Sequence, residues 1–332
     1  MERLILCGWE SDETRLLEAL RIEAQLEAVA VGDHRAAALV QARTALRLPC
    51  YQHLREMVRT TAFDAMLIAA PELAADLATD AAARGCDLLL LGDQMDGAAL
   101  EAAATASIRY GVALAVLRPA LRSAGLLFLA DFIEADARWT PVALQIDMRD
   151  DRPIHAQLRD AVATVTRLMR STPTEVIASV AGPDLDEPIV AAAHIRFEDG
   201  RLASVSAQPA ESARLRISAH TAAGTIELDS ADGDSRLTLA PRGHEPQRSL
   251  LRDEDATTLE SRRVAAVRRR DDALDARLAH REASLLHALE ASMASGLPAR
   301  VEDLGTRSTL RMLTGGSTAP TPRVGQLHVV SV

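Results

Sequence analysis

Lysine and asparagine are absent from this chain of 332 residues, so all 37 of its basic residues are arginines. A GC-rich genome, which disfavours the codons of both residues, accounts for this bias. The chemical consequence does not depend on that explanation. The chain cannot form a lysine Schiff base, and it cannot use lysine as a general acid or as a phosphate clamp.

Cysteine is scarce, with only Cys7, Cys50 and Cys86, which are far apart and form no C-x-x-C pair. This spacing argues against zinc or disulfide chemistry and fits a reducing cytoplasm. The nine histidines form no cluster, and His280 and His287 lie two turns apart on one predicted helix. That separation is too long for a close ligand pair, so we predict no metal site.

Positive charge, long apolar runs and aromatic residues are also limited. The 47 acidic residues outnumber the basic ones and give a net charge of -10, which argues against a nucleic-acid partner. No signal-like start or membrane-length apolar run is present, so we expect a cytoplasmic protein with no membrane association. Aromatic residues make up 2% of the chain, which weakens a carbohydrate-active interpretation because sugar rings often stack on aromatic faces.

The remaining composition is that of a globular protein, with 48% apolar residues and a length that fits about two domains. We place a Rossmann-like domain at residues 1–120 and an α+β domain at 121–314. A Gly-, Pro-, Ser- and Thr-rich tail at 315–332 is expected to be flexible.

The first 120 residues alternate between short apolar runs and longer stretches of helical periodicity. The runs predict buried strands at Leu4–Cys7, Ala28–Val31, Ala65–Ala70, Asp87–Leu91 and Val112–Leu117. The stretches between them predict helices at Thr14–Gln25, Arg35–Leu46, Leu73–Arg84 and Ala98–Arg109. The fold class is therefore α/β, beginning with a doubly wound parallel sheet that binds ligands at the carboxyl ends of its strands.

A different pattern follows, starting with a predicted amphipathic helix at Ile154–Met169. Asp199-Gly200 and Asp232-Gly233 indicate hairpin turns within an antiparallel sheet, open on one face, at about residues 174–242. A long helical stretch over Thr257–Ser295 contains neither Pro nor Gly. Its mixed-charge run, Arg262–Arg277, favours a solvated, salt-bridged face over a surface for an anionic partner.

Several segments carry a resemblance to a known family: LILCG, LEAVAVGDHRAAA, LPCYQHLREMV, AMLIAAP, HIRFEDGRLASVSA, AHTAAGTIELD and ALEASMASGLPARVEDLGTRSTLRML. In order and kind, these segments resemble the Gfo/Idh/MocA oxidoreductases, which act on sugars, inositols and related compounds. The resemblance covers nearly the whole chain and implies an NAD(P)-binding domain followed by an α+β domain. It rests on segments that mark the fold and not the chemistry.

The phosphate-binding turn departs from that family's G-x-G-x-x-G pattern. In the segment CGWESDE, Gly8 fits the first position, whereas Glu10 and Glu13 replace the second and third glycines. Carboxylates there would repel a pyrophosphate and fill the space it needs. The alternative is structural: these glutamates belong to an ordinary acidic helix start.

Two further positions of the resemblance are candidates for cofactor binding. Asp33 follows the second strand, where the family places an acid on the adenine ribose, although such an Asp is also a common helix cap. Pro71 lies in a turn that packs beside the nicotinamide in the family. A purely structural role as a helix-start proline is the simpler interpretation.

The catalytic positions of the family are altered as well. The family's Glu-Lys-Pro falls on Leu91, Gly92 and Asp93 here, and its Asp and His fall on Gln157 and Ala161. His155 and Asp160 lie nearby and are the only local candidates for acid–base catalysis, although His155 fits better as a residue that caps or lies beside a helix start after Pro153.

Two hypotheses of different classes follow. The favoured one is a Gfo/Idh/MocA-like pseudoenzyme, with no cofactor, used for assembly or small-ligand sensing through a protein partner or through self-association of the open sheet. The alternative is an active NAD(P)-dependent oxidoreductase on a sugar or polyol-like substrate, using Asp33 and His155 or Asp160. A nucleotide sensor that binds but does not react lies between them.

Overall fold

The computed structural model describes residues 1–9, 14–92, 95–118, 123–182, 190–231, 233–252, 256–269 and 274–302. Residues from Met1 to Glu302 form one compact unit, which contains two β-sheets. The predicted domain boundary near residue 120 stays a prediction, because residues 119–122 lie outside the described ranges. The tail at 315–332 also lies outside them.

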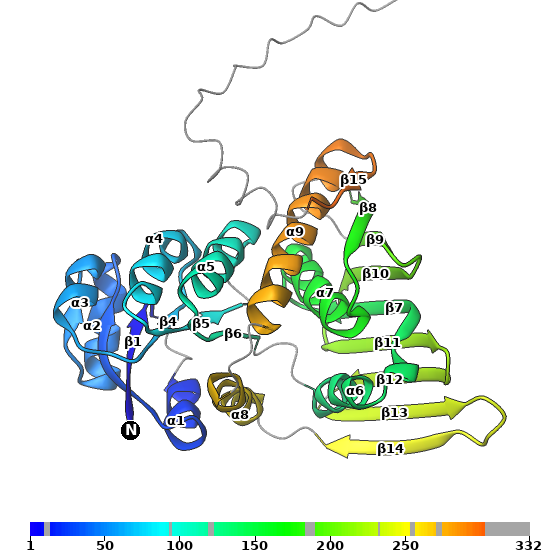
Figure 1. Cartoon of the computed structure of the whole chain (residues 1–332), viewed down its shortest axis with the longest axis horizontal. Coiled ribbons are helices and arrows are strands. Elements are labelled where there is room, and N and C mark those ends of the chain that lie inside the picture. The colour runs from blue at the N-terminus through cyan, green and yellow to red at the C-terminus, as the bar shows by residue number, and fades with distance from the viewer. Residues whose placement is uncertain are drawn as a thin grey trace, which may run out of the picture. The chain divides into compact units, whose positions relative to one another are not determined.

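The first sheet has six strands in the order β3-β2-β1-β4-β5-β6, and every neighbouring pair is parallel. The strands are β1 Glu2–Cys7, β2 Leu26–Gly32, β3 Cys50–Tyr51, β4 Ala65–Ile68, β5 Asp87–Leu91 and β6 Leu114–Leu117. Helices α4 and α5 lie on one side of the strands, whereas α1 and α8 lie on the other (Figure 1). The predicted doubly wound parallel sheet is confirmed.

The helices of this half are α1 Thr14–Glu23, α2 Ala36–Leu46, α3 Leu54–Thr60, α4 Pro71–Ala82 and α5 Gly97–Tyr110. Four of them match the predicted stretches to within two or three residues at each end. The periodicity analysis did not assign β3, which has two residues, or α3, which has seven. Segments this short hold too few apolar repeats to show a period.

The second sheet is larger than predicted and is mixed. It has nine strands in the order β14-β13-β12-β11-β7-β10-β9-β8-β15, and β10 runs parallel to β7. Its strands are β7 Pro141–Asp150, β8 Pro173–Ala181, β9 Val190–Phe197, β10 Leu202–Pro209, β11 Arg214–Thr221, β12 Gly224–Ala231, β13 Asp234–Pro241, β14 Gln247–Arg252 and β15 Ala299–Arg300. The predicted open antiparallel sheet is confirmed, but it extends beyond residues 174–242, because β7 precedes the helix Ile154–Met169 and enters the middle of the sheet, where it runs parallel to β10.

Both predicted hairpins are present. Gly200, with φ +81°, turns β9 into β10, and Gly233, with φ +82°, turns β12 into β13. Buried residues alternate with more exposed ones along β7 to β12. Helices α6 Ala124–Ala135, α7 Ile154–Met169 and α9 Leu274–Ser295 contact this sheet, together with the short 3-10 helix η3 Ala137–Trp139 beside α6. The other face carries small, polar and charged side chains, and Ile177, Val190 and Leu202 are also exposed on its strands, as expected for a half-open sheet.

The long helical stretch consists of α8 Ala256–Arg269 and α9, which pack on different elements. Helix α8 contacts α1 and β6 of the first sheet, whereas α9 lies against α5, α7 and β8. The predicted solvated face is only partly correct, because Arg263 and Arg268 of α8 are mostly buried and pair with other elements. None of the described helices is long and apolar enough to cross a membrane.

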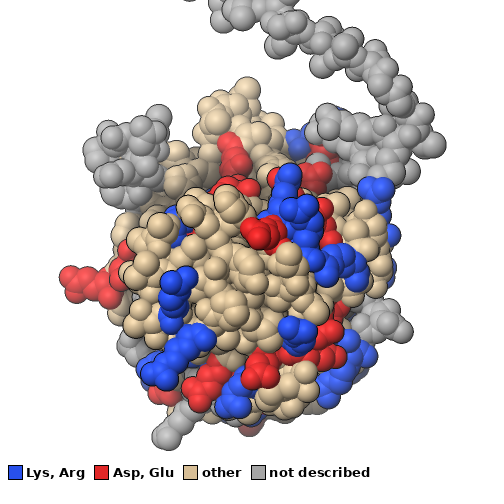
Figure 2. Space-filling model, turned by 90° about the vertical axis from the view of Figure 1, so that its left-hand side faces the viewer, with Lys and Arg blue, Asp and Glu red and all other residues tan. Residues whose placement is uncertain are grey.

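Charges of both signs are interspersed on the end of the molecule opposite the second sheet (Figure 2). A broad area without charged side chains lies among them. This face therefore does not present the single-sign positive field that a nucleic-acid backbone requires.

Candidate functional site

The carboxyl edge of the first sheet brings together the three residues predicted to contact a cofactor. Gly8 follows β1, Asp33 follows β2, and Pro71 begins α4 shortly after β4. These strands are neighbours in the sheet, and the Gly8 N–H donates to Gly32 O at 2.9 Å. Pro71 occupies the first turn of α4, as a helix-start proline does.

Asp33 is fully buried, and both of its carboxylate oxygens are occupied by protein donors. Oδ2 accepts from the Trp9 N–H at 3.0 Å and from Arg35 Nη2 at 2.9 Å. Oδ1 accepts from the Arg35 N–H at 2.7 Å and from Arg35 Nε at 3.1 Å. A carboxylate offers about four lone-pair sites. In this structure, the Asp33 carboxylate therefore has no acceptor left for a ribose hydroxyl.

The electrostatics of Asp33 follow from the same contacts. Burial raises the pKa of Asp33, but hydrogen bonds and charge from Arg35, with the Trp9 N–H, outweigh it and hold the pKa below its ordinary value. Arg35 also donates to Trp9 O at 3.1 Å. Asp33 and Arg35 thus join the turns after β1 and β2 into one bracket.

Gly8 and Trp9 shape the turn that should hold phosphates. Gly8 has φ +88°, and a Cβ there would lie 3.2 Å from Ala70 N and Cβ. The Trp9 side chain is buried in the core, and its Nε1 has no hydrogen-bond partner among the described residues. Glu10 and Glu13 lie outside those residues, so their predicted clash with a pyrophosphate stays a prediction.

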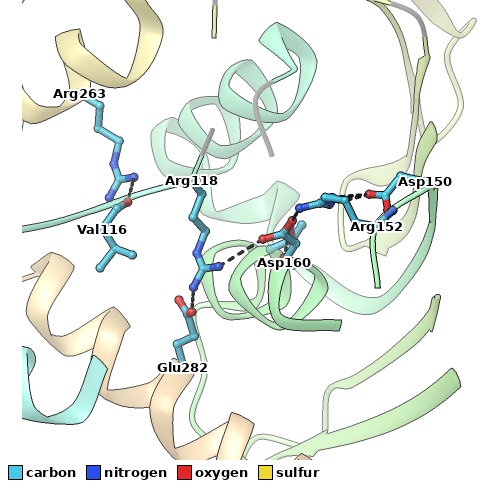
Figure 3. A network of polar contacts seen from close by, with 8 residues as sticks. Val116, Arg118, Asp150, Arg152, Asp160, Arg263 and Glu282 are labelled. Atoms are coloured by element: carbon cyan, nitrogen blue, oxygen red, sulfur yellow. Dashed lines mark hydrogen bonds and ion pairs between the residues drawn. The ribbon is translucent and has the colours of Figure 1, made fainter. Parts of the chain in front are cut away.

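A second cluster of buried charges lies where β6 ends and meets α7 and α9. Arg118 Nη1 donates to Asp160 Oδ1 at 3.2 Å, and Arg118 Nη2 donates to Glu282. Asp160 Oδ2 also lies 2.8 Å from Arg152 Nη1, and Arg152 pairs in turn with Asp150 (Figure 3). Arg118, Asp160 and Glu282 are 5%, 1% and 6% exposed, so this network is interior.

The two candidates for acid–base catalysis are not brought together. His155 is exposed near the start of α7, whereas Asp160 is buried against the arginines. Gln157, at the family's acidic position, is buried and donates to the Asp150 and Arg152 carbonyl oxygens. Asp93 lies outside the described residues.

A pocket of about 80 Å³ adjoins this network. Its lining includes Arg118 and Glu282 of the network, and also Arg167 and Arg263. Arg263 donates to Val116 O at 3.0 Å and to Asp275 Oδ2 at 2.5 Å. Within the described parts of the chain, no group of His, Cys, Asp and Glu side chains is arranged to hold a metal ion.

Sequence reasoning missed Arg35, Arg118 and Glu282. Arg35 is signalled weakly, since it stands two residues after Asp33 and can fold back onto it. Arg118 and Glu282 are 164 positions apart, and no local pattern indicates that pair.

Solved structures with the same arrangement of elements identify the fold. An NAD binding oxidoreductase from Klebsiella pneumoniae superposes with a TM-score of 0.74 and 16% identity, covering 91% of this chain and 99% of that one. The scyllo-inositol dehydrogenase from Lactobacillus casei, solved with NAD(H) and scyllo-inositol, gives 0.72 at 12% identity, covering 91% and 99%. The chain has the Gfo/Idh/MocA fold.

The WlbA dehydrogenase from Bordetella pertussis, solved with NADH and UDP-GlcNAcA, shares the Gfo/Idh/MocA fold. Its TM-score is 0.69 at 16% identity, with 90% of this chain and 98% of that chain covered. No protein-family model and no curated protein matches the sequence. At this level of identity, the likeness concerns the fold and not the activity.

Proposed function

We propose that this chain is a Gfo/Idh/MocA-fold pseudoenzyme, which serves assembly or small-ligand sensing and does not transfer hydride. The observation that carries the proposal is the Asp33 carboxylate, whose hydrogen bonds all go to Trp9 and Arg35. A dinucleotide would have to break this bracket to reach the acid. On this ground we assign no dinucleotide cofactor to this edge of the sheet.

The positions expected to carry chemistry support the same proposal. The chain has no lysine to bind substrate, and Gln157 and Ala161 stand where the resemblance places an acid and a histidine. Asp160 faces two guanidinium groups instead of an open cleft. A general base must reach a substrate proton directly or through one water, and Asp160 is held away from such a position.

The assembly role is assigned to the open face of the second sheet. Near its centre, the face carries Gln145, Asp147 and Ser218, around a shallow depression of about 430 Å³. Several of its charges pair within the sheet, as in the Arg214–Asp229 pair at 2.6 Å and the Arg149–Asp147 pair at 2.9 Å. A broad sheet face on which several charges already pair within the sheet suits contact with a second copy of the same face.

Titration calorimetry with NAD+, NADH, NADP+ and NADPH tests the proposal, after mass spectrometry has checked for co-purified cofactor. We expect no binding heat at millimolar nucleotide, because the Asp33 bracket must open at a cost. A micromolar Kd for any of the four would contradict the pseudoenzyme and favour the alternative.

That alternative is an NAD(P)-dependent oxidoreductase on a sugar or polyol-like substrate. The observation that favours it is the fold shared with dehydrogenases solved with NAD(H) or NADH. It requires Arg35 to release Asp33, and His155 or Asp160 to carry the proton.

A further inference from the structure

A cleft of about 720 Å³ lies between helices α6, α7, α8 and α9, beside the pocket described above. Five arginines line it against three carboxylates, although the whole chain has a net charge of -10. The arginines are Arg167, Arg170, Arg262, Arg263 and Arg281, and the carboxylates are Asp131, Glu134 and Asp275. The cleft thus concentrates positive charge on an acidic protein.

The arginines of this cleft differ in whether their guanidinium groups have hydrogen-bond or ion-pair partners in the protein. Arg263 pairs with Asp275 and Glu260, and Arg262 Nε lies 3.3 Å from Glu23 Oε2. By contrast, the side chains of Arg167, Arg170 and Arg281 make no hydrogen bond or ion pair with the described part of the chain. Three guanidinium groups in one cleft are therefore available to an anion.

Arg167 is the most informative of the three because it is partly buried on α7. Burial lowers the pKa of Arg167, and the positive charge of neighbouring Arg263 lowers it further. The opposing carboxylates, Asp275, Glu260 and Asp131, act by charge alone and form no hydrogen bond with it. Removing a guanidinium from water without a partner is costly, and arginine cannot relieve that cost by losing its proton.

The size and lining of the cleft indicate the kind of anion. A volume of about 720 Å³ is in the range of small-molecule sites. Apolar side chains, including Leu127, Leu259 and Val267, line the same space and suit a carbon skeleton. Guanidinium forks match phosphate oxygens, and several unpaired forks suit more than one phosphate group.

We propose that this arginine cleft binds a small organic phosphate carrying two phosphate groups. The cleft and the 80 Å³ pocket share Arg167 and Arg263, and Arg263 also holds Val116 O at the end of β6. A bound anion that attracts Arg263 therefore acts on the strand that leads into Arg118. This inference deepens the sensing role and rests on the proposed function for its purpose.

Titration calorimetry with fructose 1,6-bisphosphate tests the site, with fructose as the uncharged control. The variant Arg167→Gln removes the partly buried guanidinium. Arg159→Gln is the matched control, since it makes the same charge change on the same helix outside the cleft lining. We expect binding to the unaltered protein, weakened about tenfold or more by R167Q. R159Q should change the Kd by no more than about twofold.

A second measurement needs no ligand. Because Arg167 is partly buried without a hydrogen-bond or ion-pair partner among the described residues, R167Q should raise the thermal midpoint of the ligand-free protein, whereas R159Q should leave it unchanged. A lower midpoint for R167Q would assign Arg167 a structural role and overturn the proposal.

Inorganic pyrophosphate provides a further arm of the titration. Binding as tight as that of the bisphosphate sugar would assign recognition to the phosphate groups and support the site. No heat with either phosphate compound, or equal weakening by R159Q and R167Q, would overturn the inference. The nucleotide titration reports on the proposed function separately, so the two failures are distinguishable.

Discussion

Asp33 holds two turns of the first sheet together, and its charge is what makes the bracket strong. The contacts to Trp9 and Arg35 favour the ionised carboxylate, which lowers the pKa of Asp33 despite its burial. A carboxyl group with a lowered pKa stabilises the fold above its unfolded pKa of about 4, and this contribution is lost as the pH falls through the folded value.

We therefore expect Asp33→Asn to destabilise the protein by about 1–3 kcal/mol at neutral pH. The difference from the unaltered protein should shrink as the pH falls below about 4. Urea unfolding at neutral pH and at a pH below about 4 measures this difference in the free energy of unfolding. Asp136→Asn is the control, since Asp136 pairs with Arg138 at the surface and should change stability much less. A loss that does not depend on pH would contradict the assigned role of the Asp33 charge.

At the scale of elements, α8 shows how a late segment completes an early sheet. Its Val264 is fully buried in a core cluster with Trp9 and Leu20. Arg268 Nε donates to Asp87 Oδ2 at 2.7 Å, and Arg268 also pairs with Glu2. Burial lowers the pKa of Arg268, but these partners raise it above its ordinary value. Helix α8 is thus fixed by charge as well as by apolar contact.

Replacing Arg268 by Met should lower stability by about 1–3 kcal/mol, because Asp87 would lose its charged partner at a partly buried position. Thermal unfolding by calorimetry measures the effect. Arg269→Met serves as the control, since exposed Arg269 donates, within the described residues, only to Ala265 O of its own helix. Equal losses for the two variants would mean that general helix propensity, and not the Arg268 contact, fixes α8.

The sequence predicted most elements because their periods are local. Strands such as Asp87–Leu91 and the helix Ile154–Met169 were placed correctly from apolar spacing. The parallel pairing of β10 with β7 was not predictable, because strand direction depends on how distant segments pack. The candidate site likewise has a part that the sequence predicted and a part that only the structure shows. Gly8, Asp33 and Pro71 were placed at one sheet edge by topology, whereas the partners of Asp33 and Asp160 came only from the structure.

At the scale of the whole molecule, the open sheet face is the surface assigned to self-association. Ser218 lies on β11 near the centre of that face, and its register partners are Gln145 and Glu227. A large charged side chain there would disrupt a face-to-face contact, because its bulk would hold the two faces apart and its charge would lose water on burial.

Size-exclusion chromatography with light scattering should show a dimer at micromolar concentration. Ser218→Arg should shift it to monomer, whereas Ser212→Arg, in the exposed loop between β10 and β11, should not. A monomeric unaltered protein would remove the assembly part of the proposed function and leave the sensing part to the arginine cleft.

By itself, the sequence determined the two kinds of sheet, the positions of most helices and the absence of any lysine chemistry. These properties depend on residue type and on spacing over a few turns or strand repeats. Only the tertiary structure decided that Asp33 is bound by Arg35, that Arg118 joins Asp160 to Glu282, and that unpaired arginines gather between four helices. Side chains far apart in the sequence pair only where packing brings them within hydrogen-bond distance. Local periodicity does not predict that distance.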